Sequence, residues 1–149
     1  MAHDIKKLKP NPNGRYRQGY YNPGPKYIGR THDDRTVIYR SSLELKFCHM
    51  CDMSPSVVEW SSETLGIPYE LDGKKHTYYP DYLFKTNKGV IYMVEVKPYA
   101  QCKCPSKWSS NDVKQTYRKN IAKWDAAMKF CKAHQNMQFK IVTEKFFTT

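Results

Sequence analysis

Apolar residues recur at helical spacing in two stretches of the chain. In the first stretch, Leu43, Phe47 and Met50/Cys51 fall on one face, while Ser41 provides an N-cap and Pro55 a stop. The pattern predicts a short helix over about 42–53. The second stretch predicts the longest helix, over about 112–134. Its apolar side comprises Val113, Tyr117, Ile121, Trp124, Met128 and Cys131.

Between and after these helices, short β-branched and aromatic runs predict strands. They cover residues 36–40, 57–60, 65–69, 77–84, 90–96 and 137–143. Asp72-Gly73 and Asn87-Lys88-Gly89 are hairpin turns, and residues 101–110 form a loop. The order of helix, antiparallel strands, helix and strand predicts an α/β (α+β) domain with one central mixed sheet flanked by helices.

Residues 1–30 have a different composition from the rest of the chain. They hold four prolines, four glycines and seven Lys/Arg against one acid, with no helical or strand period. We therefore predict an extended basic arm over 1–30 and a folded domain over 31–149. The arm either tracks phosphates and stacks on bases, wraps over its own domain, or docks on a protein partner. The tyrosines available for stacking are Tyr16, Tyr20, Tyr21 and Tyr27.

Length and charge narrow the function classes. The 149 residues suffice for one domain with a real core. Lys and Arg number 25 against 14 acids, a net charge of +11, which favours a polyanion such as DNA as the partner over a neutral substrate. No apolar run reaches the length of a membrane span, so no membrane partner is expected.

The five cysteines are an odd number, which favours free thiols in a reducing compartment. Cys48-x-x-Cys51 and Cys102-x-Cys104 offer four thiolates for zinc. The alternative, which we favour, is structural, because Cys51 joins the apolar face of the first helix.

Two carboxylates stand at unusual places in the predicted sheet. Asp81 lies within an aromatic run, and Glu95 interrupts the apolar run that ends at Val96. A charge inside a sheet is unfavourable unless something compensates it. On paired strands the two carboxylates would bind one divalent ion, and Lys97 shares a strand face with Glu95. This set predicts Mg²⁺-assisted phosphodiester hydrolysis, with Mn²⁺ able to substitute.

Pro80-Asp81 followed by Glu95-Val96-Lys97 matches the PD-(D/E)xK nuclease signature. The chain resembles the small head-completion nucleases of T-even-type tailed phages and, more distantly, the N-terminal nuclease domain of the TnsA transposition endonucleases. The resemblance spans roughly residues 10–145 and rests on residues 38–47, 58–60, 79–81 and 123–127. Leu43 departs from it, because many relatives carry an aromatic residue there.

The resemblance implies a restriction-endonuclease-like core in which Asp81 and Glu95 are metal ligands and Lys97 is the catalytic lysine. It also implies that Glu44 completes the acidic set and, loosely, that Gln115 and Tyr117 face the phosphate. For Glu44 a second interpretation stays open, because Ser41-x-x-Glu44 is also a capping box.

Basic side chains cover the polar side of the second helix, where few acids balance them. The interpretations are a surface that tracks phosphates or an ordinary solvated face. The residues we predict to contact DNA are Arg40, Lys114, Gln115, Arg118 and Lys119. Trp108, in the preceding loop, either stacks on DNA or packs inward.

The expected function is a Mg²⁺-dependent deoxyribonuclease with endonuclease and exonuclease action both open. The resemblance implies action on packaged phage DNA in head completion and head–tail joining, with portal or neck proteins as partners. The expected location is the cytoplasm of the infected bacterial host, with retention in the virion neck. Two alternatives remain: a DNA-end or neck-binding protein without catalysis, and a junction-resolving or transposition-type endonuclease.

Overall fold

The computed structural model describes residues 18–31 and 33–147. Its α-helices are α1 (Ser42–Met53) and α2 (Asn111–Lys132), with 3₁₀ turns η2 (Tyr99–Gln101) and η3 (Glu144–Phe147). Its strands are β1 (Gly19–Tyr21), β2 (Val37–Tyr39), β3 (Val57–Ser62), β4 (Ile67–Leu71), β5 (Lys74–Tyr78), β6 (Tyr82–Thr86), β7 (Ile91–Val96) and β8 (Met137–Val142).

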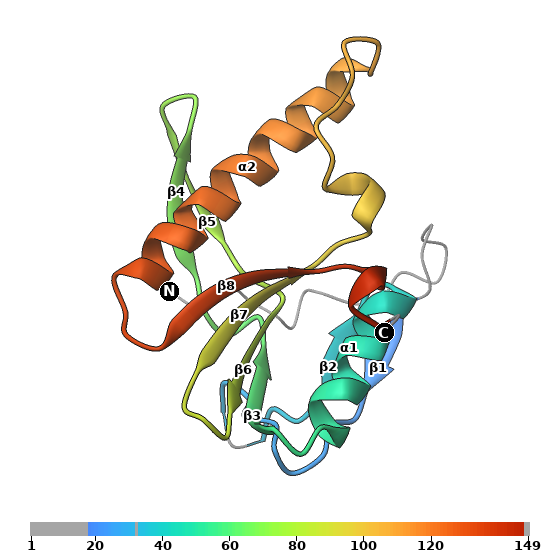
Figure 1. Cartoon of the computed structure of the whole chain (residues 1–149), viewed down its shortest axis with the longest axis vertical. Helices are drawn as coiled ribbons and strands as arrows, with labels where there is room; N and C mark the ends of the chain where they lie inside the picture. Colours follow the sequence, from blue (N-terminus) through green and yellow to red (C-terminus); the bar gives the residue numbers. More distant parts are fainter. Residues whose placement is uncertain (1–17, 32, 148–149) are drawn as a thin grey trace.

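The central sheet is mixed, in the order β3-β6-β7-β8. β6 pairs with β3 and β7 in antiparallel fashion, and β7 pairs with β8 in parallel. Two-stranded sheets β1-β2 and β4-β5 stand beside it, and α2 packs on β4 and β8 (Figure 1). The predicted mixed α+β class is confirmed. No helix within residues 18–31 and 33–147 is long and apolar enough to cross a membrane.

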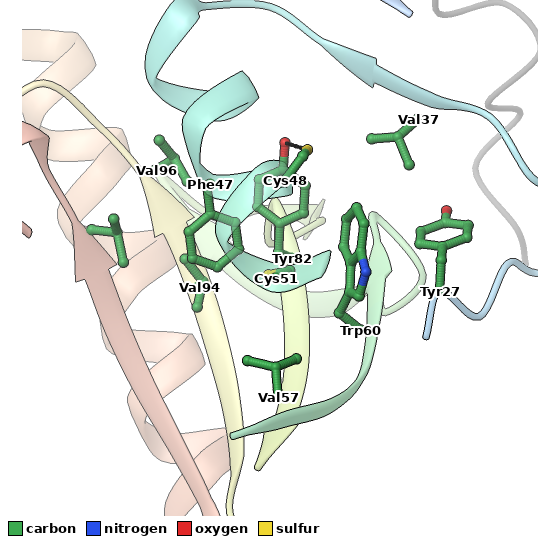
Figure 2. Packing of buried hydrophobic residues seen from close by; sticks show 11 residues of the cluster. Tyr27, Val37, Phe47, Cys48, Cys51, Val57, Trp60, Tyr82, Val94 and Val96 are labelled. Atoms are coloured by element: carbon green, nitrogen blue, oxygen red, sulfur yellow. Dashed lines mark hydrogen bonds between the residues drawn. The ribbon is translucent and has the colours of Figure 1, made fainter. Parts of the chain in front are cut away.

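Alternation along the strands builds one apolar cluster on each face of the central sheet. Val94 and Val96 of β7 pack with Phe47 of α1, whereas Met93 packs with Trp124 of α2. Figure 2 shows the cluster beneath α1. Cys48 and Cys51 are both fully buried there, as the structural interpretation of these cysteines predicts. Within the same cluster, the Cys48 thiol lies 3.4 Å from the Tyr82 hydroxyl, to which it donates.

The apolar face predicted for α2 is wrong in detail. The residues that it buries are Asn120, Trp124, Ala127 and Cys131. By contrast, Val113, Ile121 and Met128 are 50%, 44% and 49% exposed. The helix packs on β4 and β8, and its N-terminal part, which carries Val113, extends past the sheet (Figure 1). Ile121 and Met128 lie at the edge of the packed side, where they line a hollow with Phe139 and Ile141 of β8.

The single strand predicted over 77–84 is also wrong. The chain leaves β5 at Tyr78 and enters β6 at Tyr82, and these strands belong to different sheets. Pro80 lies at the break, and a proline cannot donate a ladder hydrogen bond. Asp81 therefore lies in the bend before β6 and not inside a strand.

Residues 18–30, which we assigned to the arm, pack on the domain. β1 pairs with β2, and Tyr27 is 4% exposed with its ring centroid 4.8 Å from that of Trp60. The Tyr21 hydroxyl donates to Asp52, so Tyr21 and Tyr27 serve the packing of this domain. For this stretch the structure follows the alternative in which the arm wraps over its own domain. Tyr20 is 59% exposed, and Tyr16 lies outside the described residues.

Candidate active site

The hairpin of β6 and β7 brings Asp81 and Glu95 together. Tyr82 pairs with Val94, so the next step of the antiparallel register sets Asp81 opposite Glu95. The Asp81 carboxylate accepts a hydrogen bond of 2.8 Å at Oδ2 from the backbone N–H of Val96. Glu95 itself is only 9% exposed. A carboxylate from the bend before β6 and one from β7 thus lie opposite each other at one end of the hairpin.

Glu95 is held through both of its oxygens. Oε1 accepts a short hydrogen bond from the Tyr78 hydroxyl, and Oε2 lies 3.6 Å from Nζ of Lys97. Lys97 follows β7 and extends its ladder, because its N–H donates to the Val142 carbonyl at 2.9 Å. Glu95 and Lys97 therefore share one side of the chain, as their spacing predicts.

The electrostatics of the site oppose a full set of negative charges. Burial raises the pKa of Asp81 well above its usual range, and the carboxylates of Glu95 and Glu44 raise it further. The Val96 N–H stabilises the ionised form but does not offset these effects. A bound cation would relieve this repulsion, because opposite charge favours the ionised carboxylates.

Glu44 lies in the first turn of α1 and takes part in the helix cap. Its N–H donates to Oγ of Ser41 at 3.1 Å, and its Oε1 accepts from the N–H of Arg40 at 3.2 Å. In a standard capping box the N–H of the N-cap residue, here Ser41, donates to the glutamate. Here the donor is the N–H of Arg40, one residue before the N-cap. Burial raises the pKa of Glu44 to about 7; Arg40 lowers it, and Glu63 and Glu95 raise it. Glu44 thus helps to cap α1, and it is also close enough to Glu95 for the two carboxylates to repel each other.

Arg40, which we predicted to contact DNA, has a partner within the protein. Its guanidinium forms a 2.7 Å ion pair with Glu63. Glu63 has a φ of 52° and donates its N–H to the carbonyl of Asp81 at 3.1 Å. Arg40 and Glu63 therefore brace the bend that carries Asp81.

The other four predicted DNA contacts lie on α2, and all four are exposed. Arg118 pairs with Asp72 at the tip of the β4-β5 hairpin and lies 3.5 Å from Oε1 of Gln115. Lys114 donates to the carbonyl of Lys107 at 2.9 Å. Lys119 is close enough to Lys123 to lower the pKa of that lysine. Tyr117 lines a hollow between α2 and the preceding loop.

Two residues that reach the site were missed from the sequence. Tyr78, from β5, holds Glu95, and Nζ of Lys123 lies 5.7 Å from the centroid of the Tyr78 ring. Burial lowers the pKa of Lys123, Lys119 lowers it further, and Glu95 opposes this change. Pro80 was the signal that could have separated Tyr78 from β6. For Lys123, the weaker signal was the neighbouring Trp124, because a tryptophan next to it suggests that this part of α2 faces the sheet.

The carboxylates of the site suit a hard cation, but they do not by themselves supply all of its ligands. Within the described ranges, no three His, Cys, Asp or Glu side chains group in a way that could hold a metal ion. Asp81 and Glu95 supply carboxylate oxygens only, which suits Mg²⁺ or Mn²⁺. Each carboxylate oxygen has two acceptor sites, so the bonds from Tyr78 and Val96 leave others for a metal. Cys48 and Cys51 are packed in the core beneath α1, so this pair does not support a zinc site.

A mixed sheet with helices packed on it and an Asp–Glu–Lys set at one hairpin end defines a restriction-endonuclease-like nuclease core. Residues 54–144 match the family described as TnsA-like endonuclease N terminal, and the chain belongs to this family. It is also similar to the head completion nuclease of Enterobacteria phage T4. The two are 31% identical over 133 residues, covering 80% of this chain and 87% of the relative. The resemblance drawn from the motifs is confirmed.

Proposed function

We propose that this nuclease is a metal-dependent deoxyribonuclease whose centre is Asp81, Glu95 and Lys97. The observation that carries the proposal is that Asp81, in the bend before β6, lies opposite Glu95 of β7, with the lysine Nζ 3.6 Å from Glu95. The raised pKa of Asp81 supports it, because such a pair of acids favours a cation. Mg²⁺ is the expected ion and Mn²⁺ the expected substitute.

Each residue has a distinct task in this proposal. Asp81 and Glu95 hold the metal, with the Val96 N–H and the Tyr78 hydroxyl fixing their orientation. When bound, the metal polarises the phosphate, lowers the pKa of water and neutralises developing charge. Lys97 orients the attacking water or donates a hydrogen bond to the phosphate. Glu44 assists the acidic set, and with its pKa near 7 it releases a proton when a cation binds.

The relative's name supports a role in phage assembly. We propose that this chain cuts or trims packaged phage DNA before heads and tails join, in the cytoplasm of the infected bacterium. Portal or neck proteins are then the partners, and the protein stays in the virion neck. A junction-resolving or transposition-type endonuclease would use the same centre on branched DNA.

Cleavage of plasmid, linear, branched and single-stranded DNA tests the proposal. We expect cleavage by the wild type with Mg²⁺ or Mn²⁺ and none with EDTA. Asp81→Asn and Lys97→Ala should abolish cleavage and retain DNA binding. Lys129→Ala is the matched control, because this exposed lysine forms an ion pair with Asp125 on its own helix.

The outcomes separate the alternatives. Preference for branched DNA would favour the junction-resolving type. Binding to DNA ends without cleavage by any version would favour the non-catalytic neck protein. Metal-independent cleavage, or full activity of Asp81→Asn, would overturn the proposed centre.

A further inference from the structure

The loop of residues 102–110, between η2 and α2, presents Trp108 to solvent. Its side chain is 84% exposed, whereas Trp60 and Trp124 are 2% and 6% exposed. Figure 1 shows this loop and the start of α2 standing well away from the central sheet. A tryptophan is among the most unfavourable side chains to leave in water, because its indole carries a large apolar area. The exposure therefore needs a reason.

The loop is held in place by its own hydrogen bonds. The N–H of Trp108 donates to Oγ of Ser106 at 3.3 Å, and the N–H of Ser109 donates to the Ser106 carbonyl at 3.1 Å. Lys114 reaches back from α2 to the Lys107 carbonyl, and Ser110 caps the helix by accepting from the Val113 N–H at 3.2 Å. These bonds fix the backbone that carries the indole, so the loop loses little conformational entropy when a ligand binds.

The surroundings of the indole are basic. Nζ of Lys107 lies 5.0 Å from the centroid of the Trp108 ring, and Lys103 and Lys114 occupy the same loop and the adjoining helix turn. Asp112 is the acid in this segment, at the first turn of α2. A protein that binds single-stranded nucleic acid combines cations along the backbone with an aromatic face for a base.

The loop also begins beside the candidate centre. It starts at Cys102, five residues after Lys97 in the chain. The chain therefore runs from Lys97 through η2 into the loop that carries Trp108.

We propose that Trp108, with Lys107, is a stacking site for an unpaired base of DNA, at a frayed end or in a single-stranded stretch. This inference rests on the proposed function, because it takes DNA as the substrate. The partner is unpaired DNA and not intact duplex, since a protruding indole stacks only on an exposed base face. The site would direct the nuclease to ends or gaps.

The protein carries its own probe for this site. Because Trp60 and Trp124 are buried, quenching of the intrinsic fluorescence by acrylamide reports mainly on Trp108. The full-length protein is titrated in EDTA with a single-stranded oligonucleotide, a duplex with frayed ends and a duplex closed by hairpins at both ends. We expect the first two to quench the emission and to shield it from acrylamide, and the closed duplex to do neither.

Substitutions give the affinity. Trp108→Ala should weaken binding of the single strand roughly 5- to 150-fold, the range for loss of one base–aromatic stack. Trp108→Phe should restore part of it, and binding of the closed duplex should not change. Lys132→Ala, an exposed lysine at the far end of α2, is the control with normal binding.

Two results would overturn the inference in distinguishable ways. If the wild type binds and cleaves DNA while Trp108→Ala binds the single strand equally well, the stacking site is wrong and the proposed function stands. Trp108 would then serve a protein partner instead. If the wild type binds none of the three DNAs, the proposed function fails and this inference fails with it.

Discussion

Replacing Glu44 by glutamine should make the metal-free protein more stable at pH 8. Burial and the neighbouring acids raise the pKa of Glu44 from 4.5 to about 7. At about 1.4 kcal/mol for each pKa unit, the ionised side chain destabilises the fold by about 3 kcal/mol above pH 7. Glutamine keeps an oxygen for the Arg40 N–H but carries no charge. Losing a first-turn negative charge costs about 0.5 kcal/mol, which leaves a net gain of about 2–3 kcal/mol.

The gain should depend on pH with a definite sign. Below pH 4.5 the carboxyl is protonated in both the folded and the unfolded states, so it contributes no difference in stability. Between pH 4.5 and 7 the folded protein keeps a proton that the unfolded chain has released, and the stability of the wild type falls as pH rises. The advantage of Glu44→Gln should therefore shrink below about 1 kcal/mol at pH 5.

Urea unfolding of both proteins at pH 5 and pH 8, in EDTA, measures this difference. At pH 8 the melting temperature should also rise by roughly 4–10 °C. The control is Glu70→Gln, an exposed glutamate on β4, which should change stability little. Mg²⁺ should stabilise the wild type more than Glu44→Gln. A variant that is less stable than the wild type at pH 8 would show that the cap outweighs the charge repulsion.

Two further predictions concern residues whose contacts are clear. Tyr78→Phe keeps the ring beside Lys123 but removes the hydroxyl that holds Glu95, so calorimetry should show Mn²⁺ affinity reduced roughly 10- to 100-fold. Equal affinity in variant and wild type would mean that the hydroxyl does not position Glu95. Phe47→Ala removes a fully buried ring beneath α1 and should lower the free energy of unfolding by about 3–5 kcal/mol. A loss below about 1 kcal/mol would mean that this cluster is not the main core.

The sequence determined the features that depend on neighbours along the chain. Ser41 and Pro55 bound the first helix, which runs over Ser42–Met53 as predicted. Glu95 and Lys97 share one side because side chains alternate along a strand, a relation that needs no tertiary information. The signature residues also identified the nuclease family, which the match over 54–144 confirms.

Only the tertiary structure decided which distant groups meet. The partner of Glu95, the Tyr78 hydroxyl, comes from a different sheet, and the raised pKa of Glu44 depends on burial and on Glu63 and Glu95. The exposed side of α2 depends on where β4 and β8 lie, so the apolar stripe at helical spacing identified Trp124 and Cys131 correctly but not Asn120 and Ala127. Local sequence fixes periodicity and turns, whereas burial and electrostatic coupling arise from contacts between distant segments. For that reason the sequence named Asp81, Glu95 and Lys97, whereas the fold supplied their contacts and the burial that raises the pKa of Asp81.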